Sequence, residues 1–262
     1  MTEPADAEAL ARENRQLARK LARLTENTKQ LEQIRDGNSK LLSRLMQELE
    51  QERARSRELL LNVLPQQIVD RLESGETMIA DRFDDVGVLF SDFVGFTEIS
   101  STLSAATLVE ELNRLFSEFD VLCSELGVEK IKTIGDAYLA VAGLTGEGDH
   151  LAAVCELALG MLEAVERVAT TAQATWRIRI GVHAGPAVAG VIGMRKFAYD
   201  VWGDTVNVAS RLEASSEPGR IHVSARIADE LRDRFVFESR GSIELQGKGE
   251  TETCFLVGRL AG

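Results

Sequence analysis

The sequence predicts an α+β protein in which helices pack on one face of a mainly antiparallel sheet, preceded by a long N-terminal coiled-coil helix. Two observations support this prediction. From residue 83 onward, apolar strand patterns alternate with long amphipathic helices, and short connections join several strands as hairpins. Between residues 5 and 60, leucines recur at seven-residue spacing among charged side chains.

Composition limits the classes of function. The 262 residues leave room for one sizeable globular domain and an accessory segment. A net charge of −12 argues against nucleic-acid and polybasic membrane-surface binding. The sequence has no apolar stretch of membrane-spanning length, and its first residues lack the features of a signal peptide. Three scattered cysteines indicate reduced thiols and no zinc site. We therefore expect a soluble cytoplasmic protein, or the cytosolic part of a larger one.

Residues 5–60 are expected to form a parallel dimeric coiled coil. Asn14 lies on the predicted seam, where a buried Asn favours two parallel helices in register. Arg35 and Asn38 also lie on it, beside Gly37, so its middle should pack poorly. The alternative is a single solvated helix, which would leave the leucines in water. The leucines of the two seam positions are Leu10, Leu17, Leu24, Leu31, Leu45 and Leu59, and Leu21, Leu42 and Leu49.

A connector is predicted at residues 57–80, before a globular domain at 81–262. In "RELLLNVLPQQIVDRLESGE" (57–76), Pro65 interrupts a helix and Gly75 ends a second, short one. The domain's predicted strands are 84–92, 128–134, 137–142, 176–183, 186–193 and 219–224, with a strand pair near the C-terminus. Its predicted helices are 104–126, 150–170 and 204–215, with a short one after residue 224.

Two acidic residues stand out because each adjoins an apolar strand. Asp92 ends the run in "VGVLFSDF" (86–93), and Asp136 follows Gly135 at a predicted hairpin tip. Antiparallel pairing of these strands would bring the two carboxylates to one edge, where they repel by several kcal/mol, about 4 at 4 Å. One or two divalent cations would remove that repulsion, and oxygen ligands without His or Cys favour Mg²⁺ or Mn²⁺. The alternative is two turn or cap aspartates without a metal.

Two further segments carry weaker signals. After Asp92, Gly95 permits a tight turn before a helical segment, which is a favourable place for phosphate oxygens. On the predicted helix after Gly203, Asn207 and Arg211 are four residues apart and share a face. An amide and a guanidinium can position a ribose and stabilise charge at phosphorus, but a surface Asn and a solvated Arg are the simpler interpretation.

Four motifs together decide between these interpretations. The segments "FSDFVGFT" (90–97), "KTIGDAYLAVAG" (132–143), "RIGVHAGPAVAGVIG" (179–193) and "YDVWGDTVNVASRLE" (199–213) resemble, in order and spacing, the signatures of class III nucleotidyl cyclases. The resemblance covers roughly residues 80–258. It implies a ferredoxin-like antiparallel-sheet sandwich, the catalytic fold of that family. Residues 57–76 resemble the transducer element that often precedes such a domain.

The resemblance implies a role for each matching residue. Asp92, Asp136 and the main-chain carbonyl of Phe93 would bind two Mg²⁺ or Mn²⁺ ions. Asn207 and Arg211 would act on the transition state as catalytic residues.

The substrate contacts follow in the same way. Lys132 and Asp200 would read the adenine edge, since an ammonium donates to N1 and a carboxylate accepts from the N6 amine. Guanylyl members typically carry Glu and Cys at these two places, and a mismatch would leave buried polar groups unpaired. Arg179 would contact the terminal phosphates.

The remaining contacts expected for the triphosphate come from Phe96, Thr97 and Lys248. Here the chain departs from the family pattern, because "LQGKGE" has Gln246 where a lysine is usual and retains only Lys248. Either Lys248 or Arg179 compensates, or triphosphate binding is weaker than usual.

The resulting prediction is an adenylyl cyclase that converts ATP into 3′,5′-cyclic AMP and pyrophosphate. In this family the site lies between two subunits, so a homodimer would hold two equivalent sites. An upstream sensor domain or partner would act through the coiled coil. The alternatives are a guanylyl cyclase, disfavoured by Lys132 and Asp200; a diguanylate cyclase, which would need a GG[DE]EF motif; a catalytically weak nucleotide-binding module; and a coiled-coil scaffold.

Overall fold

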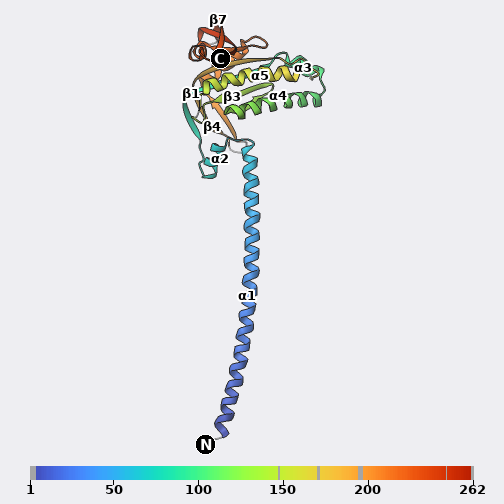
Figure 1. Ribbon diagram of the computed structural model, residues 1–262, viewed down its shortest axis with the longest axis vertical. Coiled ribbons are helices and arrows are strands. Elements are labelled where there is room, and N and C mark those ends of the chain that lie inside the picture. The colour runs from blue at the N-terminus through green and yellow to red at the C-terminus, as the bar shows by residue number, and fades with distance from the viewer. Residues whose placement is uncertain (1–3, 147, 170–171, 194–196, 246, 261–262) are drawn as a thin grey trace. The chain divides into compact units, whose positions relative to one another are not determined.

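The computed structural model describes residues 4–146, 148–169, 172–193, 197–245 and 247–260 (Figure 1). The chain divides into two compact units, Met1–Val63 and Leu64–Gly262, and each is described by itself. No helix among the described residues is long and apolar enough to cross a membrane.

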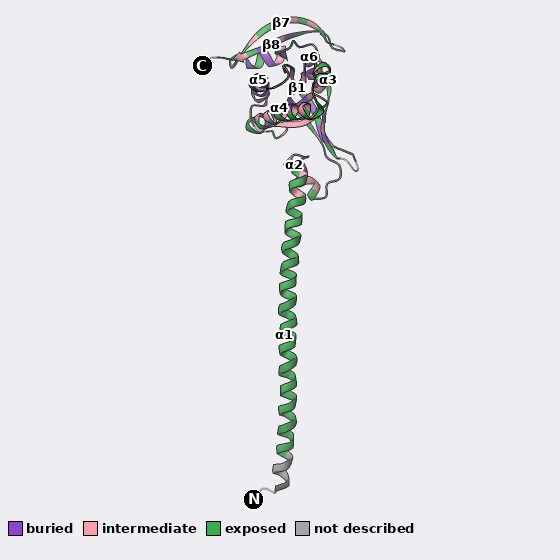
Figure 2. Cartoon of the chain, turned by 90° about the vertical axis from the view of Figure 1, so that its right-hand side faces the viewer, coloured by how far each residue is buried: buried purple, intermediate pink, exposed green. Residues whose placement is uncertain are grey.

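The first unit consists of helix α1 (Pro4–Leu61), which continues through Gly37 without a break. Every leucine on the predicted seam is more than half exposed, as the green colouring of the helix in Figure 2 shows. A row of exposed leucines of this length is costly in water unless another helix covers it. The long helix is therefore confirmed, whereas the pairing of two such helices stays a prediction.

The described residues of the second unit form an eight-stranded, mainly antiparallel sheet. Its strand order is β2-β3-β1-β4-β6-β8-β7, with β5 paired to β4, and among these strands only β4 and β6 run parallel. This confirms the predicted α+β class. The strands are β1 (Ala80–Phe93), β2 (Val128–Ile134), β3 (Ala137–Ala142), β4 (Ile178–Ile192), β5 (Ala198–Trp202), β6 (Ile221–Ser224), β7 (Phe235–Leu245) and β8 (Gly249–Arg259).

Helices cover both faces of the sheet, so the prediction that they occupy one face is wrong. A Cβ at Gly87 would lie 2.8 Å from Val154 of α5, whereas a Cβ at Gly181 would lie 2.1 Å from the backbone nitrogen of Glu213 in α6. Gly181 pairs with Phe90, three residues beyond Gly87, so the two glycines face opposite sides. The helices are α2 (Gln66–Glu73), α3 (Phe96–Thr102), α4 (Ala105–Leu126), α5 (His150–Ala169), α6 (Asp204–Ala214) and α7 (Ala225–Leu231).

The main core lies between the sheet and helices α4 and α5, which run beside each other in Figure 1. Trp176, Tyr138 and Phe119 are its largest fully buried side chains. On the α6 face a smaller cluster joins Leu245, at the end of β7, to Val208 and Leu212 of α6. This contact brings the β7–β8 turn onto the helix that carries Asn207 and Arg211.

Two strands differ from the prediction. The expected strands 176–183 and 186–193 form one strand, β4, which runs through Gly185 and Pro186. Proline cannot donate a ladder hydrogen bond, and here it lies opposite an irregularity of β1 between Phe83 and Val86. The short strand β5 was not predicted, because its few residues show no clear alternation, and pairing with β4 is what holds it.

The close approach of α6 to β4 can be tested at Gly181. Its Cβ in an alanine variant would collide with backbone atoms of Ala209 and Glu213, which cannot move aside as a flexible side chain would. We expect Gly181→Ala to lower the free energy of unfolding by about 1–3 kcal/mol or more, measured by urea denaturation. Gly258→Ala is the control, since a Cβ there meets nothing within 4 Å. Equal stability of the two variants would contradict the packing described here.

Candidate active site

The structure brings Asp92 and Asp136 together, and we call them the carboxylate pair. Asp92 is the second-last residue of β1, and Asp136 follows Gly135 in the turn between β2 and β3. Strand β3 pairs with β1 so that Tyr138 lies opposite Ser91, which carries the turn to the end of β1. Burial raises the pKa of Asp136, and the negative charge of Asp92 raises it further. The two side chains are therefore close enough to disfavour simultaneous ionisation.

The donor set of this pair fits a hard divalent cation. No group of three or more His, Cys, Asp or Glu side chains among the described residues could hold a metal ion. Two carboxylates, with a main-chain carbonyl and substrate oxygens, would form the oxygen coordination that Mg²⁺ or Mn²⁺ prefers. A cation between Asp92 and Asp136 would also remove the repulsion that raises the pKa of Asp136.

Arg179 lies beside the carboxylate pair and contacts two acidic side chains. Its Nη2 donates a hydrogen bond to Asp92 Oδ2 at 3.1 Å, and its Nε lies 3.2 Å from Glu213 Oε1. Burial raises the pKa of Glu213 to about 7, although Arg179 opposes that shift. The sequence does not single out Glu213. An acid near the end of a short helix has no local pattern that distinguishes it from a solvated one.

Lys132 and Asp200, the base-reading pair, also meet within one chain. Lys132 Nζ on β2 lies 2.5 Å from Asp200 Oδ2 on β5, although the residues are 68 positions apart. The other oxygen of Asp200 accepts the backbone N–H of Val201 at 2.9 Å. The carboxylate is thus oriented, and it is more buried than the ammonium, with 16% against 39% of the side chain exposed.

Asn207 and Arg211 lie one turn apart on α6 and form the helix pair. Gly203, with φ at +142°, precedes the helix, a backbone conformation that favours glycine. A Cβ at Gly247 would lie 3.7 Å from Arg211 Nη1, so the β7–β8 turn reaches this guanidinium. In the same turn Lys248 forms an ion pair with Asp204. Gln246, whose effect on triphosphate binding the sequence left open, lies outside the described residues.

Phe96 and Thr97 begin the short helix α3, after Gly95 with φ at +69°. The Phe96 ring packs against Trp176, with the ring centroids 6.5 Å apart, so part of the ring contacts the hydrophobic core. Thr97 is exposed.

The predicted site residues therefore form separate groups. Among the described residues, no direct hydrogen bond or ion pair joins the carboxylate pair to the base-reading pair or the helix pair. Arg179 nevertheless contacts both Asp92 and Glu213 of α6, the helix that carries Asn207 and Arg211.

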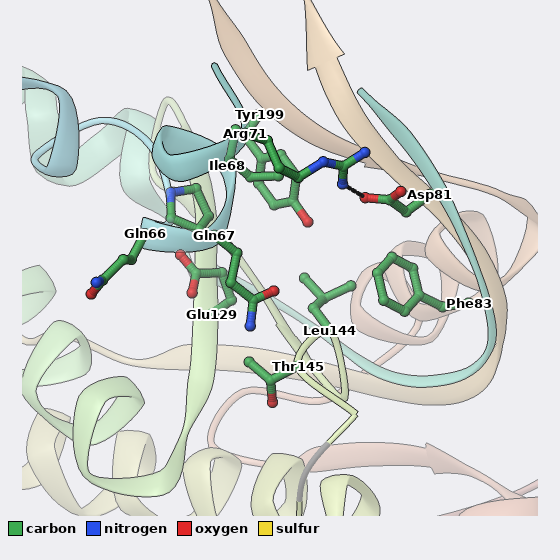
Figure 3. Close-up of a pocket in the computed structure, with 11 residues that line it drawn as sticks. Gln66, Gln67, Ile68, Arg71, Asp81, Phe83, Glu129, Leu144, Thr145 and Tyr199 are labelled. Carbon is green, nitrogen blue, oxygen red and sulfur yellow. Dashed lines mark hydrogen bonds and ion pairs between the residues drawn. The ribbon is translucent and has the colours of Figure 1, made fainter. Parts of the chain in front are cut away.

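A cavity of about 200 Å³ lies apart from these groups, between α2 and the strands β1, β2 and β5 (Figure 3). Arg71 of α2 binds Asp81 and Glu76 at its edge. Tyr199 lines the cavity while the next residue, Asp200, faces the other side of β5. None of the predicted site residues lines it. The cavity instead lies between the connector helix α2 and the strands that carry the base-reading pair.

Comparison with known proteins defines the class to which this fold and site belong. Residues 78–258 match the family described as the adenylate and guanylate cyclase catalytic domain. The chain belongs to this family.

Two kinds of curated relatives illustrate the range of the family. An adenylate cyclase of Mycobacterium tuberculosis is 44% identical over 213 residues, which cover 80% of this chain and 48% of that protein. Atrial natriuretic peptide receptor 2 of Homo sapiens is 38% identical over 238 residues, covering 88% of this chain and 23% of that protein. The chain spans at most about half the length of these relatives.

Solved structures agree with the fold. The guanylate cyclase domain of RhGC from Catenaria anguillulae, in complex with GTP, superposes with a TM-score of 0.65 at 35% identity, covering 69% of this chain and 100% of that chain. The adenylyl cyclase CyaB from P. aeruginosa superposes with a TM-score of 0.64 at 26% identity, covering 68% and 95%. The predicted family and fold are thus confirmed.

Proposed function

We propose that this chain is an adenylyl cyclase that converts ATP into 3′,5′-cyclic AMP and pyrophosphate. The observation that supports it most is the Lys132–Asp200 ion pair, held 2.5 Å apart beside the sheet in a member of the cyclase family. An ammonium can donate to adenine N1 and a carboxylate can accept from the N6 amine. Guanine presents the opposite pattern at these atoms, so the same pair would disfavour GTP.

Each group of the site has a distinct task in the proposed reaction. The base-reading pair binds the adenine edge, Asn207 orients the ribose, and Arg211 stabilises negative charge at the α-phosphate. The 3′-oxygen forms a bond to the α-phosphorus, the bond to the pyrophosphate oxygen breaks, and the 3′-hydroxyl proton passes to Asp92 or to water. Lys248 and the start of α3, with Phe96 and Thr97, lie near the phosphates.

A divalent cation belongs to this mechanism. Asp92, Asp136 and the main-chain carbonyl of Phe93 would hold it, and two Mg²⁺ or Mn²⁺ ions per site are proposed. When bound, the metal lowers the pKa of the attacking hydroxyl and neutralises the leaving pyrophosphate. The carboxylate pair contributes by holding two carboxyl groups close together near the end of β1, where the cation would bind.

The separation of the site groups supports a homodimer with two shared sites. The carboxylate pair of one chain would face the base-reading pair and helix pair of the other, and a two-fold axis would generate the second site. The exposed leucines of α1 supply a surface through which two chains could associate in parallel. A sensor domain or partner acting through this helix is proposed as the input.

The proposed activity is tested by incubating the purified chain with ATP or GTP and Mg²⁺ or Mn²⁺ and identifying the product by mass. We expect cyclic AMP from the wild type, and a loss of at least about 100-fold in rate for Asp92→Ala and for Arg211→Ala. Gly258→Ala, on an open surface, serves as the control. Formation of cyclic GMP alone would instead identify a guanylyl cyclase. If no product forms, the chain is a nucleotide-binding module without cyclase activity.

The shared site is tested by complementation. Asp92→Asn and Asn207→Ala chains, each inactive alone, should regain part of the wild-type rate when mixed, because a heterodimer contains one site with every residue intact. The measurement is the cyclase rate after subunit exchange, monitored by fluorescence transfer between labelled chains. Complete exchange without recovered activity would count against a site made by two chains.

Base selectivity is tested by exchanging the base-reading pair. Lys132→Glu with Asp200→Cys should shift the ratio of kcat/KM for ATP and GTP toward GTP by about 10-fold or more, since each mismatch leaves a polar group unpaired. Steady-state rates with both nucleotides measure the ratio. An unchanged preference for ATP would contradict the proposal that Lys132 and Asp200 recognise the adenine base.

A further inference from the structure

The cavity between α2 and the strands β1, β2 and β5, which we call the α2 cavity, has the size and lining of a site for a small molecule (Figure 3). Its volume is about 200 Å³, several times the roughly 30 Å³ that one water molecule occupies in the liquid. Its lining combines the apolar side chains of Ile68, Phe83 and Leu144 with a few polar groups, as sites for small molecules usually do. All of its lining residues belong to the second unit.

Glu129 on β2 is a carboxylate in this lining that has no counter-charge. Among the described residues, none forms an ion pair or a hydrogen bond with its side chain. Burial raises the pKa of Glu129, and no described neighbour lowers it. A partly buried carboxylate without a partner is costly to ionise, so a cation placed beside it would be favourably bound.

Arg71 is the only cationic side chain among the described residues that line the α2 cavity, and two carboxylates already neutralise it. Its Nε and Nη2 each donate a hydrogen bond of 2.7 Å to Glu76, and its Nη1 contacts Asp81. The two carboxylates carry one negative charge more than the guanidinium. The cavity and its edge are therefore net negative, which favours a cationic ligand and disfavours an anion such as a nucleotide.

The hydroxyl of Tyr199 on β5 is a second group without a partner. The residue is only 9% exposed, and its hydroxyl points into the cavity in Figure 3. Among the described residues, none forms a hydrogen bond with this hydroxyl. Burial first, and then the negative charges of Glu129 and Asp81, raise the pKa of Tyr199 to about 12. The hydroxyl and the Glu129 carboxylate are therefore close enough to hold one ligand group between them.

We propose that the α2 cavity binds a small organic cation, a primary ammonium attached to a short apolar body. The ammonium donates hydrogen bonds to the Glu129 carboxylate and to the Tyr199 oxygen. The apolar body lies against Phe83 and Leu144, and the aromatic rings in the lining attract the positive charge. The site is separate from the proposed reaction, since none of the predicted site residues lines the cavity.

Such a ligand contacts two parts of the second unit at once. Gln67 belongs to α2, whereas Glu129 and Tyr199 belong to strands of the sheet. A ligand that binds both parts has a higher affinity for the state in which α2 lies against the sheet than for a state in which α2 has left it. Binding therefore makes local opening of α2 rarer.

The test compares three compounds of similar size and different charge on the full chain at neutral pH. Benzylammonium carries the required cation, benzyl alcohol is neutral, and benzoate carries the opposite charge. We expect benzylammonium to bind with a dissociation constant on the order of 1 mM, and the other two at least about 10-fold more weakly, measured by saturation-transfer NMR titration. No detectable binding of benzylammonium, or equal or tighter binding of either other compound, would overturn the proposal.

Two variants test the two polar groups. Glu129→Gln keeps the size of the side chain and removes its charge, and we expect it to weaken benzylammonium binding by about 10-fold or more. Tyr199→Phe removes one neutral hydrogen bond, and we expect a loss of about 3-fold or more. Wild-type affinity in either variant would contradict the site. If Glu129→Gln does not fold, Tyr199→Phe decides alone.

The matched control is Asp84→Asn. Asp84 lies on β1 next to Phe83, but its side chain is 97% exposed and does not line the cavity. The variant removes the same charge as Glu129→Gln from the same region of the surface. We expect wild-type affinity for benzylammonium. A loss equal to that in Glu129→Gln would assign the binding to the negative charge of the whole chain and overturn the proposal.

Hydrogen exchange measured by mass spectrometry locates the ligand. The amides of α2 (Gln66–Glu73) exchange when this helix opens locally. We expect benzylammonium at ten times its dissociation constant to slow their exchange by about 10-fold in the wild type. Unchanged exchange would place the ligand elsewhere and contradict the proposal. The cyclase assignment would stand in that case, because product formation from ATP tests it separately.

Discussion

Two carboxyl groups, Asp92 near the end of β1 and Asp136 in the β2–β3 turn, lie close together although their negative charges repel each other. Burial and the charge of Asp92 both raise the pKa of Asp136. Such an arrangement persists only where the surrounding structure fixes it. Here the β1–β3 register and the tight β2–β3 turn, with Gly135 at positive φ, provide that fixation.

The pairing register of the strands determines where the other groups of the site lie. Arg179 stands opposite Asp92 because β4 is the antiparallel neighbour of β1, and Asp200 stands opposite Gly190 near the far end of the same strand. One long strand thus lies between the carboxylate pair and the base-reading pair within a chain. The glycine at position 181 then decides how closely α6, with its own functional residues, approaches that strand.

The connector helix α2 packs against the rest of the second unit. Ile68 and Val69 of α2 are buried, and Arg71 ties the helix to Glu76 and Asp81. Beside it, the cavity of Figure 3 borders Glu129 on β2 and Tyr199 on β5, the strands of the base-reading pair.

Local patterns in the sequence were enough to predict the long N-terminal helix, most of the strands and helices, and the two strand-end aspartates. Heptad leucines and apolar runs are read from neighbouring residues, and the cyclase motifs are contiguous segments. The continuity of β4 through Pro186 could not be predicted, because a proline in a strand depends on an irregularity in the strand beside it. Strand β5 and the placement of α6 on the second face depend in the same way on partners distant in the chain.

The sequence by itself determined the class of protein, because residue types and spacings carry that information directly, and it supplied the residues from which the chemistry of the site is proposed. Only the tertiary structure decided how those residues are combined. It paired Lys132 with Asp200 across 68 positions, brought Asp136 to Asp92, and enclosed Glu213 against Arg179. Burial and charge compensation are properties of packed neighbours. The burial of an acid on a short helix, such as Glu213, can therefore be recognised only when the strand that packs against the helix is known.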